Sequence, residues 1–105
     1  MATGVSHTLG GIVYKTFSAP EAKVRRSTVA ALKRMQIDIV EITRDGNKER
    51  IKARASDREI DIEIESLTPK TTRMTVTATK ENSLIRDSAT ATEIILQTEK
   101  LVGTG

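Results

Sequence analysis

Two neighbouring stretches in the middle of the chain alternate between apolar and charged residues. The first covers residues 49–55 and the second covers residues 59–65. Their apolar positions are Ile51, Ala53 and Ala55 in the first stretch and Ile60, Ile62 and Ile64 in the second. A period of two is typical of a β-strand with one buried side and one solvent-facing side. With the short segment 56–58 between them, the two stretches predict a β-hairpin.

Opposite charges indicate how the two strands of this hairpin pair. The predicted charged pairs are Arg54 with Asp61, Lys52 with Glu63, and Arg50 with Glu65. The predicted apolar pairs on the other side are Ala53 with Ile62 and Ile51 with Ile64. A slip of one residue would place isoleucine beside charge, so the hydrophobic pattern and the charges agree on this register.

Three further stretches have the composition of strands. Residues 12–17 and 37–43 are rich in β-branched residues, and residues 72–80 place Met74, Val76 and Ala78 on one side. Branched and aromatic side chains fit a pleated surface, so each stretch predicts a strand. The turn-forming residues 45–47 and 68–70 predict the connections within a run of four consecutive strands.

Two amphipathic segments predict helices on either side of the run of four strands. The first begins at Ser18, with Glu21 completing a capping box, and continues to about Met35. Its predicted inward face consists of Val24, Thr28, Ala31, Leu32 and Met35. The second begins at Asn82 or Ser83 and ends at Gly103. Its predicted apolar stripe consists of Leu84, Ala91, Ile94, Ile95, Leu101 and Val102.

The order strand, helix, four strands, helix predicts an α+β fold. We expect one antiparallel sheet of about five strands, with both helices packed on one face, because each strand has one apolar side to cover. Residues 1–11 hold three glycines and no periodic pattern, so we expect a flexible arm there. Residues 12–103 are predicted to form a single domain. We expect the first strand at one edge of the sheet, and which of the two edges stays open at this point.

Composition adds a bias towards aliphatic packing. The chain of 105 residues has 11 Ile, 7 Val and 6 Leu, but one Phe, one Tyr and no Trp or Cys. Without cysteine there is no disulfide framework, cysteine-based zinc site or thiol chemistry. No stretch approaches the length of a membrane-spanning helix, and residues 1–11 lack the apolar segment of a signal peptide. We therefore expect no transmembrane segment and no export signal within the chain.

Charge is distributed unevenly along the chain. Residues 1–58 hold 12 basic and 6 acidic side chains, whereas residues 59–105 hold 5 basic and 8 acidic side chains. A basic stripe lies on the predicted outer face of the first helix and consists of Lys23, Arg26, Lys33 and Arg34. Clustered cations of this kind bind phosphates, although a solvated helix face has the same pattern. Nucleic-acid binding is thus the alternative function, and the scarcity of aromatic residues disfavours it.

Catalytic and metal-binding patterns are missing from the sequence. Asp61, Glu63 and Glu65 could bind a hard cation, but cross-strand ion pairs explain them more simply. His7 is the only imidazole and lies in the predicted arm. No nucleophile motif, phosphate-binding loop or dinucleotide fingerprint occurs. We therefore expect no catalytic residues, no bound metal and no cofactor, and we predict that the protein is not an enzyme.

Several segments resemble a family of small bacterial proteins classed as a domain of unknown function. They are YKTFSAPEAKV, AALKRMQIDIVE, IKARASDREIDIEIESL, TPKTTRMTVTA and DSATATEIILQTEKLVG, which together span roughly residues 12–103. Many members of that family are similar to exported proteins or lipoproteins. The resemblance implies a place in the cell envelope or periplasm, and it implies no activity.

The remaining hypothesis is a non-catalytic interaction module. An aliphatic core leaves the polar side of the sheet available to a protein partner. The residues expected to form this surface are Arg50, Lys52, Arg54, Asp61, Glu63, Glu65 and Arg73, with Thr75 and Thr77 beside them. We expect a protein as the partner, and nothing in the sequence points to a small-molecule substrate. The sequence does not indicate an oligomeric state.

Overall fold

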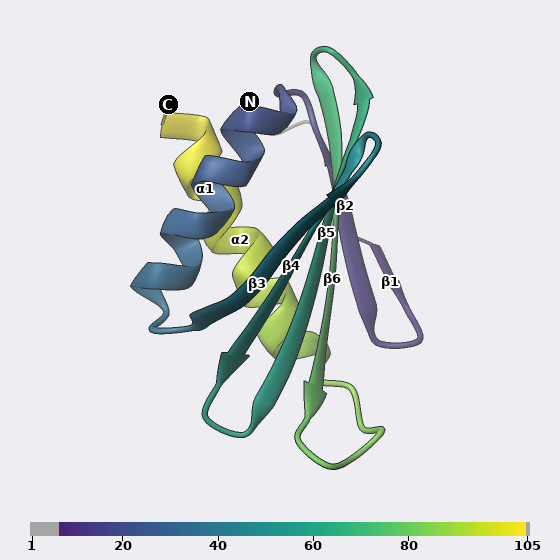
Figure 1. Ribbon diagram of the computed structural model, residues 1–105, viewed down its shortest axis with the longest axis vertical. Coiled ribbons are helices and arrows are strands. Elements are labelled where there is room, and N and C mark those ends of the chain that lie inside the picture. The colour runs from purple at the N-terminus through teal and green to yellow at the C-terminus, as the bar shows by residue number, and fades with distance from the viewer. Residues whose placement is uncertain (1–6, 105) are drawn as a thin grey trace.

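The computed structural model describes residues 7–104, which form six strands and two helices around one sheet (Figure 1). In chain order these elements are β1 (His7–Leu9), β2 (Ile12–Phe17), α1 (Glu21–Arg34), β3 (Asp38–Asp45), β4 (Lys48–Ala55), β5 (Arg58–Thr68), β6 (Thr71–Lys80) and α2 (Ser88–Thr104). The predicted α+β class is therefore confirmed, with six strands in place of about five.

The strand order in the sheet is β1-β2-β6-β5-β4-β3, and all the pairings are antiparallel. The predicted meander corresponds to β3 through β6. The first predicted strand, β2, does not lie at an edge of the sheet as expected, because it pairs with β6 on one side and with β1 on the other. The predicted flexible arm was partly wrong, because residues 7–9 form β1 and pair with β2. Residues 1–6 of that arm lie outside the described residues.

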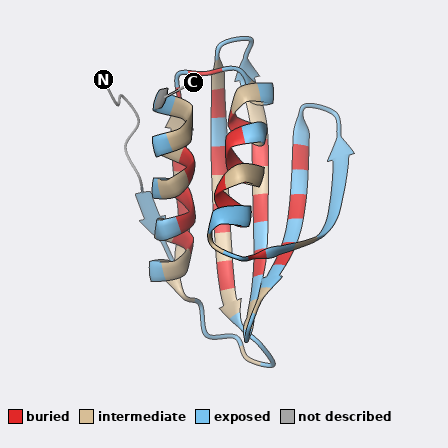
Figure 2. Ribbon diagram, turned by 90° about the vertical axis from the view of Figure 1, so that its left-hand side faces the viewer, coloured by how far each residue is buried: buried red, intermediate tan, exposed pale blue. Residues whose placement is uncertain are grey.

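Both helices cover the same face of the sheet, as predicted, and lie side by side on it (Figures 1 and 2). Along each central strand every second residue is buried beneath them (Figure 2). The largest fully buried side chains are Val13, Val24, Thr28, Leu32, Ile51, Ile60, Ile62, Ile64, Met74, Val76, Ile94 and Ile95. The core is aliphatic, and the opposite face of the sheet has no helix over it. That uncovered face is called the open sheet face below.

The first helix starts later than its sequence suggests. The N-cap of α1 is Pro20, and no side chain caps the helix, so the predicted capping box of Ser18 and Glu21 is wrong. A residue that precedes proline avoids the helical conformation, which keeps Ala19 out of the helix and leaves Ser18 too far away to cap it. Glu21 instead forms an ion pair with Arg44 of β3. The predicted inward residues of α1 are buried except Met35, which is half-buried.

The second helix also starts later, at Ser88 rather than at Asn82 or Ser83. The Asp87 carboxylate caps it by accepting hydrogen bonds from the Thr90 backbone N–H at 3.1 Å and from Thr90 Oγ1 at 2.6 Å. Residues 81–87 form a loop in which Leu84 is 96% exposed, so its predicted place in the apolar stripe is wrong. The helix also continues one residue beyond Gly103, its predicted end.

Two charged side chains, Lys15 and Glu49, are buried on the helix-covered side of the sheet, where only apolar residues were expected. Lys15 of β2 is 4% exposed, and its Nζ atom lies 3.5 Å from Oε2 of Glu99 on α2. The same ammonium group lies 5.6 Å from the centre of the Phe17 ring. Burial of a charge is costly unless a partner compensates for it, and Glu99 supplies that partner from the far end of the chain.

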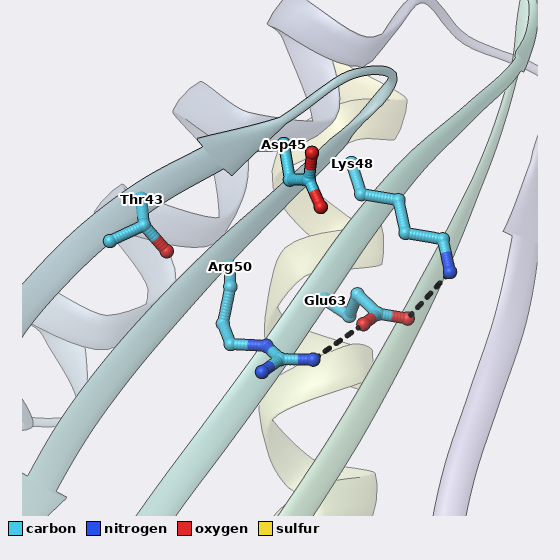
Figure 3. Close-up of a pocket in the computed structure, with 5 residues that line it drawn as sticks. All are labelled: Thr43, Asp45, Lys48, Arg50 and Glu63. Atoms are coloured by element: carbon cyan, nitrogen blue, oxygen red, sulfur yellow. Dashed lines mark hydrogen bonds and ion pairs between the residues drawn. The ribbon is translucent and has the colours of Figure 1, made fainter.

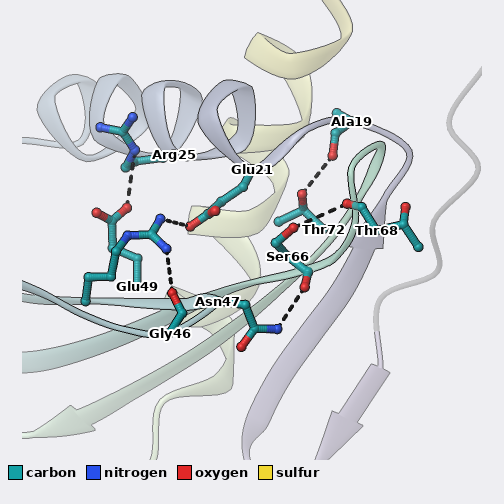
Figure 4. A network of polar contacts seen from close by, with 10 residues as sticks. Ala19, Glu21, Arg25, Gly46, Asn47, Glu49, Ser66, Thr68 and Thr72 are labelled. Atoms are coloured by element: carbon teal, nitrogen blue, oxygen red, sulfur yellow. Dashed lines mark hydrogen bonds and ion pairs between the residues drawn. The ribbon is translucent and has the colours of Figure 1, made fainter.

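A second group of polar contacts fastens α1 and the chain leading into it to the sheet (Figure 4). Arg25 Nε lies 3.3 Å from Glu49 Oε1, beneath the edge of the helix. Thr72 Oγ1 donates a hydrogen bond of 2.7 Å to the carbonyl of Ala19. Arg44, which pairs with Glu21, also donates to the carbonyl of Gly46 at 2.9 Å. These contacts join α1 to β3 and β4, and they join the segment before the helix to β6.

Candidate binding surfaces

The open sheet face carries two parallel columns of opposite charge. Because side chains alternate along a strand, every second residue of β4 and β5 points away from the helices. The cationic column on β4 consists of Lys48, Arg50, Lys52 and Arg54, and the carboxylate column on β5 consists of Glu59, Asp61, Glu63 and Glu65. On β6 the same face continues with Arg73, Thr75 and Thr77. The structure thus brings together every residue of the predicted partner surface.

The pairing between the two columns differs from the predicted register by two residues. Arg54 lies opposite Glu59, Lys52 opposite Asp61, and Arg50 opposite Glu63, so all three predicted charged pairs are wrong. On the buried side Ile51 faces Ile62 and Ala53 faces Ile60, which corrects both apolar pairs as well. A shift of two residues leaves every side chain on its predicted face, so alternation alone cannot detect it.

The turn between the strands decides the register. Ala55 pairs with Arg58, which leaves Ser56 and Asp57 as a two-residue loop. Ser56 adopts a φ of +49°, the left-handed conformation that tight hairpin loops need. The predicted register would have placed the loop one residue later, at Asp57 and Arg58.

The best-connected ion pairs of the open sheet face surround Glu63 (Figure 3). Arg50 Nη2 donates to Glu63 Oε2 at 3.0 Å, and Lys48 Nζ lies 4.0 Å from Glu63 Oε1. This hydrogen bond raises the pKa of the Arg50 guanidinium above its ordinary value. Thr43 and Asp45 of β3 complete a shallow hollow of about 230 Å³ here.

A second hollow of about 320 Å³ lies beside the first. Its polar lining comes from three strands and consists of Arg50, Lys52, Asp61, Glu63, Thr75 and Thr77. Lys52 and Asp61 face each other across β4 and β5. Within the described part of the chain, neither of them forms an ion pair of the kind that holds Arg50 to Glu63. Their charged groups therefore remain available to a partner.

The outer face of α1 is the second candidate surface. Arg26, Lys33 and Arg34 are exposed there, and Lys23 is half-buried. Among residues 7–104 none of these four cations has a carboxylate within ion-pair distance, whereas Arg25 is paired with Glu49. Arg25, Arg26, Val29, Ala30 and Lys33 line a shallow hollow of about 340 Å³. The predicted cationic stripe is therefore present on the surface.

Comparison with protein families adds a classification. The model of one family matches residues 1–81, which is most of the chain. The chain belongs to that family, Protein of unknown function (DUF3568). No curated protein matches this DUF3568 chain. The predicted resemblance to a domain of unknown function is confirmed. The matched region contains α1 and all six strands of the DUF3568 chain, and so it contains both candidate surfaces.

The acidic side chains and the single histidine of this DUF3568 chain are spread over the fold. Across the described residues, acidic and histidine side chains nowhere gather in a group of three or more that could hold a metal ion. His7 lies on β1 rather than in a flexible arm, and its ring centre is 5.2 Å from that of Tyr14. Between residues 7 and 104, no helix is long and apolar enough to span a bilayer.

Sequence reasoning missed part of the open sheet face. Lys48 and Glu59 extend the two columns at their ends, and Thr43 and Asp45 add the rim on β3. The first two follow the same alternation as their neighbours, so the period of two could have found them. The register shift between Ile39 and Glu41 breaks the alternation in β3, so the pattern could not assign its faces.

Proposed function

We propose that this protein is a non-catalytic interaction module that binds a protein partner through the open sheet face. The observation that carries the proposal is the uncovered pair of charge columns on β4 and β5. Neighbouring strands lie about 4.8 Å apart, so cations and carboxylates alternate over short distances there. Such a surface complements another protein surface with the opposite pattern better than it complements a uniform polyanion.

The geometry around Glu63 supports a binding role over acid–base chemistry. Its carboxylate is engaged by Arg50 and lies beside Lys48, which together orient it. A general acid or base needs a free lone pair or proton aimed at a substrate, whereas these oxygens face cations. Placement in the bacterial cell envelope is part of the proposal and rests on the sequence resemblance described above.

The test uses a charge swap between facing residues. The Lys52→Asp/Asp61→Lys double variant keeps the net charge and the cross-strand pairing, so it should fold like the wild type while presenting the inverse pattern. Immobilised protein is exposed to envelope and cytosolic fractions, and retained proteins are identified by mass spectrometry. We expect at least one envelope protein to be retained by the wild type and lost with the swap variant.

A matched control separates this surface from α1. The Lys33→Asp variant changes a cation on the opposite side of the molecule and should retain the same partner. If the swap variant retains every protein that the wild type retains, the open sheet face is not the binding surface. Retention of cytosolic proteins only would contradict the envelope placement.

A second candidate function is electrostatic binding of nucleic acid through α1. The specific observation is that Lys23, Arg26, Lys33 and Arg34 have no acidic partner among the described residues. Phosphate binding needs clustered cations and releases counterions, so its affinity falls steeply with salt. The columns of the open sheet face would not produce such behaviour, since their charges compensate one another.

Mobility-shift titration with duplex DNA and with single-stranded RNA at low salt tests this candidate. Replacement of all four cations by glutamate should abolish any retardation, and the Lys52→Asp/Asp61→Lys swap should leave it unchanged. Absence of retardation by the wild type at low salt would remove nucleic-acid binding as a function of α1.

A further inference from the structure

The loop between β6 and α2 exposes two large aliphatic side chains at one end of the molecule. Leu84 is 96% exposed and Ile85 is 60% exposed. Figure 1 shows this loop, in light green, projecting beyond the ends of the strands. Single exposed aliphatic residues are common on protein surfaces, but two adjacent ones on a projecting loop are not required by the packing of the fold.

Internal hydrogen bonds hold the loop in this conformation. The Lys80 backbone N–H donates to the carbonyl of Ile85 at 2.9 Å, which closes the loop at its base. The Ile85 backbone N–H donates to Ser83 Oγ at 2.8 Å. Thr79 and Arg86 form a further antiparallel bridge. Exposure of Leu84 and Ile85 is therefore a property of the folded loop.

The loop is also fastened to the turn between β1 and β2. Arg86 Nη1 donates to the carbonyl of Gly10 at 2.6 Å. Gly11 has a φ of +86°, and a Cβ atom there would lie 2.7 Å from Arg86 Cβ, so only glycine allows this approach. Leu9, which is 73% exposed, precedes this turn. We call Leu9, Leu84 and Ile85 the apolar tip.

The charges at this end of the molecule leave two cations without an acidic partner. Each nearby carboxylate is within 4.0 Å of an arginine: Asp57 and Asp87 beside Arg58, and Glu59 and Glu81 beside Arg54. Lys80 and Arg86 have no such partner within residues 7–104. Lys80 and Arg86 are thus the two cations beside the apolar tip that no carboxylate engages directly.

We propose that the apolar tip inserts into the interface of a lipid bilayer with anionic headgroups. A convex tip can enter the boundary between headgroups and acyl chains, and the neighbouring cations of Lys80 and Arg86 lie where they can meet anionic headgroups. Weak hydrophobic insertion combined with electrostatic attraction is enough for reversible binding to a membrane surface. The inference goes beyond the proposed function and does not depend on which surface binds a partner.

Vesicle cosedimentation tests the aliphatic contribution. Phosphatidylcholine vesicles with phosphatidylglycerol should bind the wild type, and pure phosphatidylcholine vesicles should bind it more weakly. The Leu84→Ser/Ile85→Ser variant should bind anionic vesicles about tenfold more weakly, because the apolar area that enters the interface is lost. The Leu67→Ser variant is the control, since Leu67 is 39% exposed near the opposite end of β5.

Fluorescence locates the inserted residue directly. The chain contains no tryptophan, so a Leu84→Trp variant carries a single probe. Its emission should shift to shorter wavelength on anionic vesicles and should be quenched by brominated lipid, whereas a Leu67→Trp variant should show neither effect. Lys80→Gln should weaken binding to anionic vesicles about fivefold, and Lys70→Gln at the opposite end should not.

Three results would overturn the proposal. One is the absence of wild-type binding to anionic vesicles. Another is binding that survives Leu84→Ser/Ile85→Ser but is lost with Lys33→Glu, which would place α1 on the membrane. The third combines two observations. The wild type retains a protein partner that the Leu84→Ser/Ile85→Ser variant loses, and the emission of the Leu84→Trp variant does not shift when anionic vesicles are added. Unchanged unfolding of the serine variant in urea shows that lost binding is not lost folding.

Discussion

Arg58 Nε donates a hydrogen bond of 2.8 Å to Asp87 Oδ2, which joins the first residue of β5 to the residue that caps α2. Asp87 thus has two roles, because the same carboxylate also accepts two hydrogen bonds from Thr90. The contact attaches the start of the second helix to the sheet.

Replacement of Asp87 should destabilise the protein. The Asp87→Ala variant loses the helix cap, and loss of such a cap costs about 0.5–2 kcal/mol of unfolding free energy. Urea unfolding followed by circular dichroism measures the loss. The control is Asp38→Ala, at an exposed position on edge strand β3, which should change stability by less than about 0.5 kcal/mol. Equal stability of both variants would contradict the capping role.

Stability should also depend on pH through Asp87. Hydrogen bonds from Thr90 and Arg58 hold the pKa of the Asp87 carboxyl well below its ordinary value of 3.8. A carboxyl with a lowered pKa in the folded state stabilises the protein above its unfolded-state pKa and loses that contribution as the pH falls. The stability difference between the wild type and Asp87→Asn should therefore be constant from about pH 5 to 7 and shrink below about pH 4. A difference that grows towards low pH would contradict this assignment.

The ion pair between buried Lys15 and half-buried Glu99 should respond asymmetrically to substitution. Lys15→Met removes the buried ammonium and leaves only Glu99, whose side chain is 29% exposed and can be hydrated, so the cost should be small. Glu99→Gln leaves the ammonium buried without a counter-charge and should cost about 1–3 kcal/mol. Thermal unfolding of both variants at neutral pH makes the comparison. A larger loss for Lys15→Met than for Glu99→Gln would contradict this account of the pair.

Disulfide formation can distinguish the observed hairpin register from the one that charge pairing predicts. The chain has no native cysteine, so any disulfide that forms must join the two engineered cysteines. Directly facing residues have Cα atoms about 4.5–5.5 Å apart, within the range that a disulfide spans. Lys52→Cys/Asp61→Cys should oxidise readily. Lys52→Cys/Glu63→Cys is a diagonal pair, and it should stay reduced under the same conditions; the reverse outcome would support the predicted register.

Alternation in the sequence was sufficient to assign the faces of the central strands, because burial on one side imposes a period of two. For that reason all seven predicted partner-surface residues, from Arg50 to Arg73, lie on the open sheet face. The pairing register of β4 with β5 could not be predicted from alternation, since it depends on the left-handed conformation of Ser56 in the turn. Two registers that differ by two residues bury the same isoleucines.

Long-range partners explain most of the remaining differences. Lys15 can be buried because Glu99 of α2 supplies a counter-charge. No residue near Lys15 in the sequence predicts that contact. Asp87 starts α2 because Arg58 and Thr90 both bind it, although Asn82 and Ser83 have equally suitable side chains for a cap. Local sequence patterns identified the helices and strands, whereas tertiary contacts determined the residues at which they begin and end.

The position of β2 has a consequence for synthesis on the ribosome. Strand β2 leaves the exit tunnel before its partner β6, which ends at Lys80, so the β1–β2 hairpin has no sheet to join until β3 to β6 have also emerged. The contiguous strands β3 to β6 can pair as they appear, because each contacts its sequence neighbour. We therefore expect the docking of the first hairpin against β6, and the packing of α2 over both strands, to follow the pairing of β3 to β6.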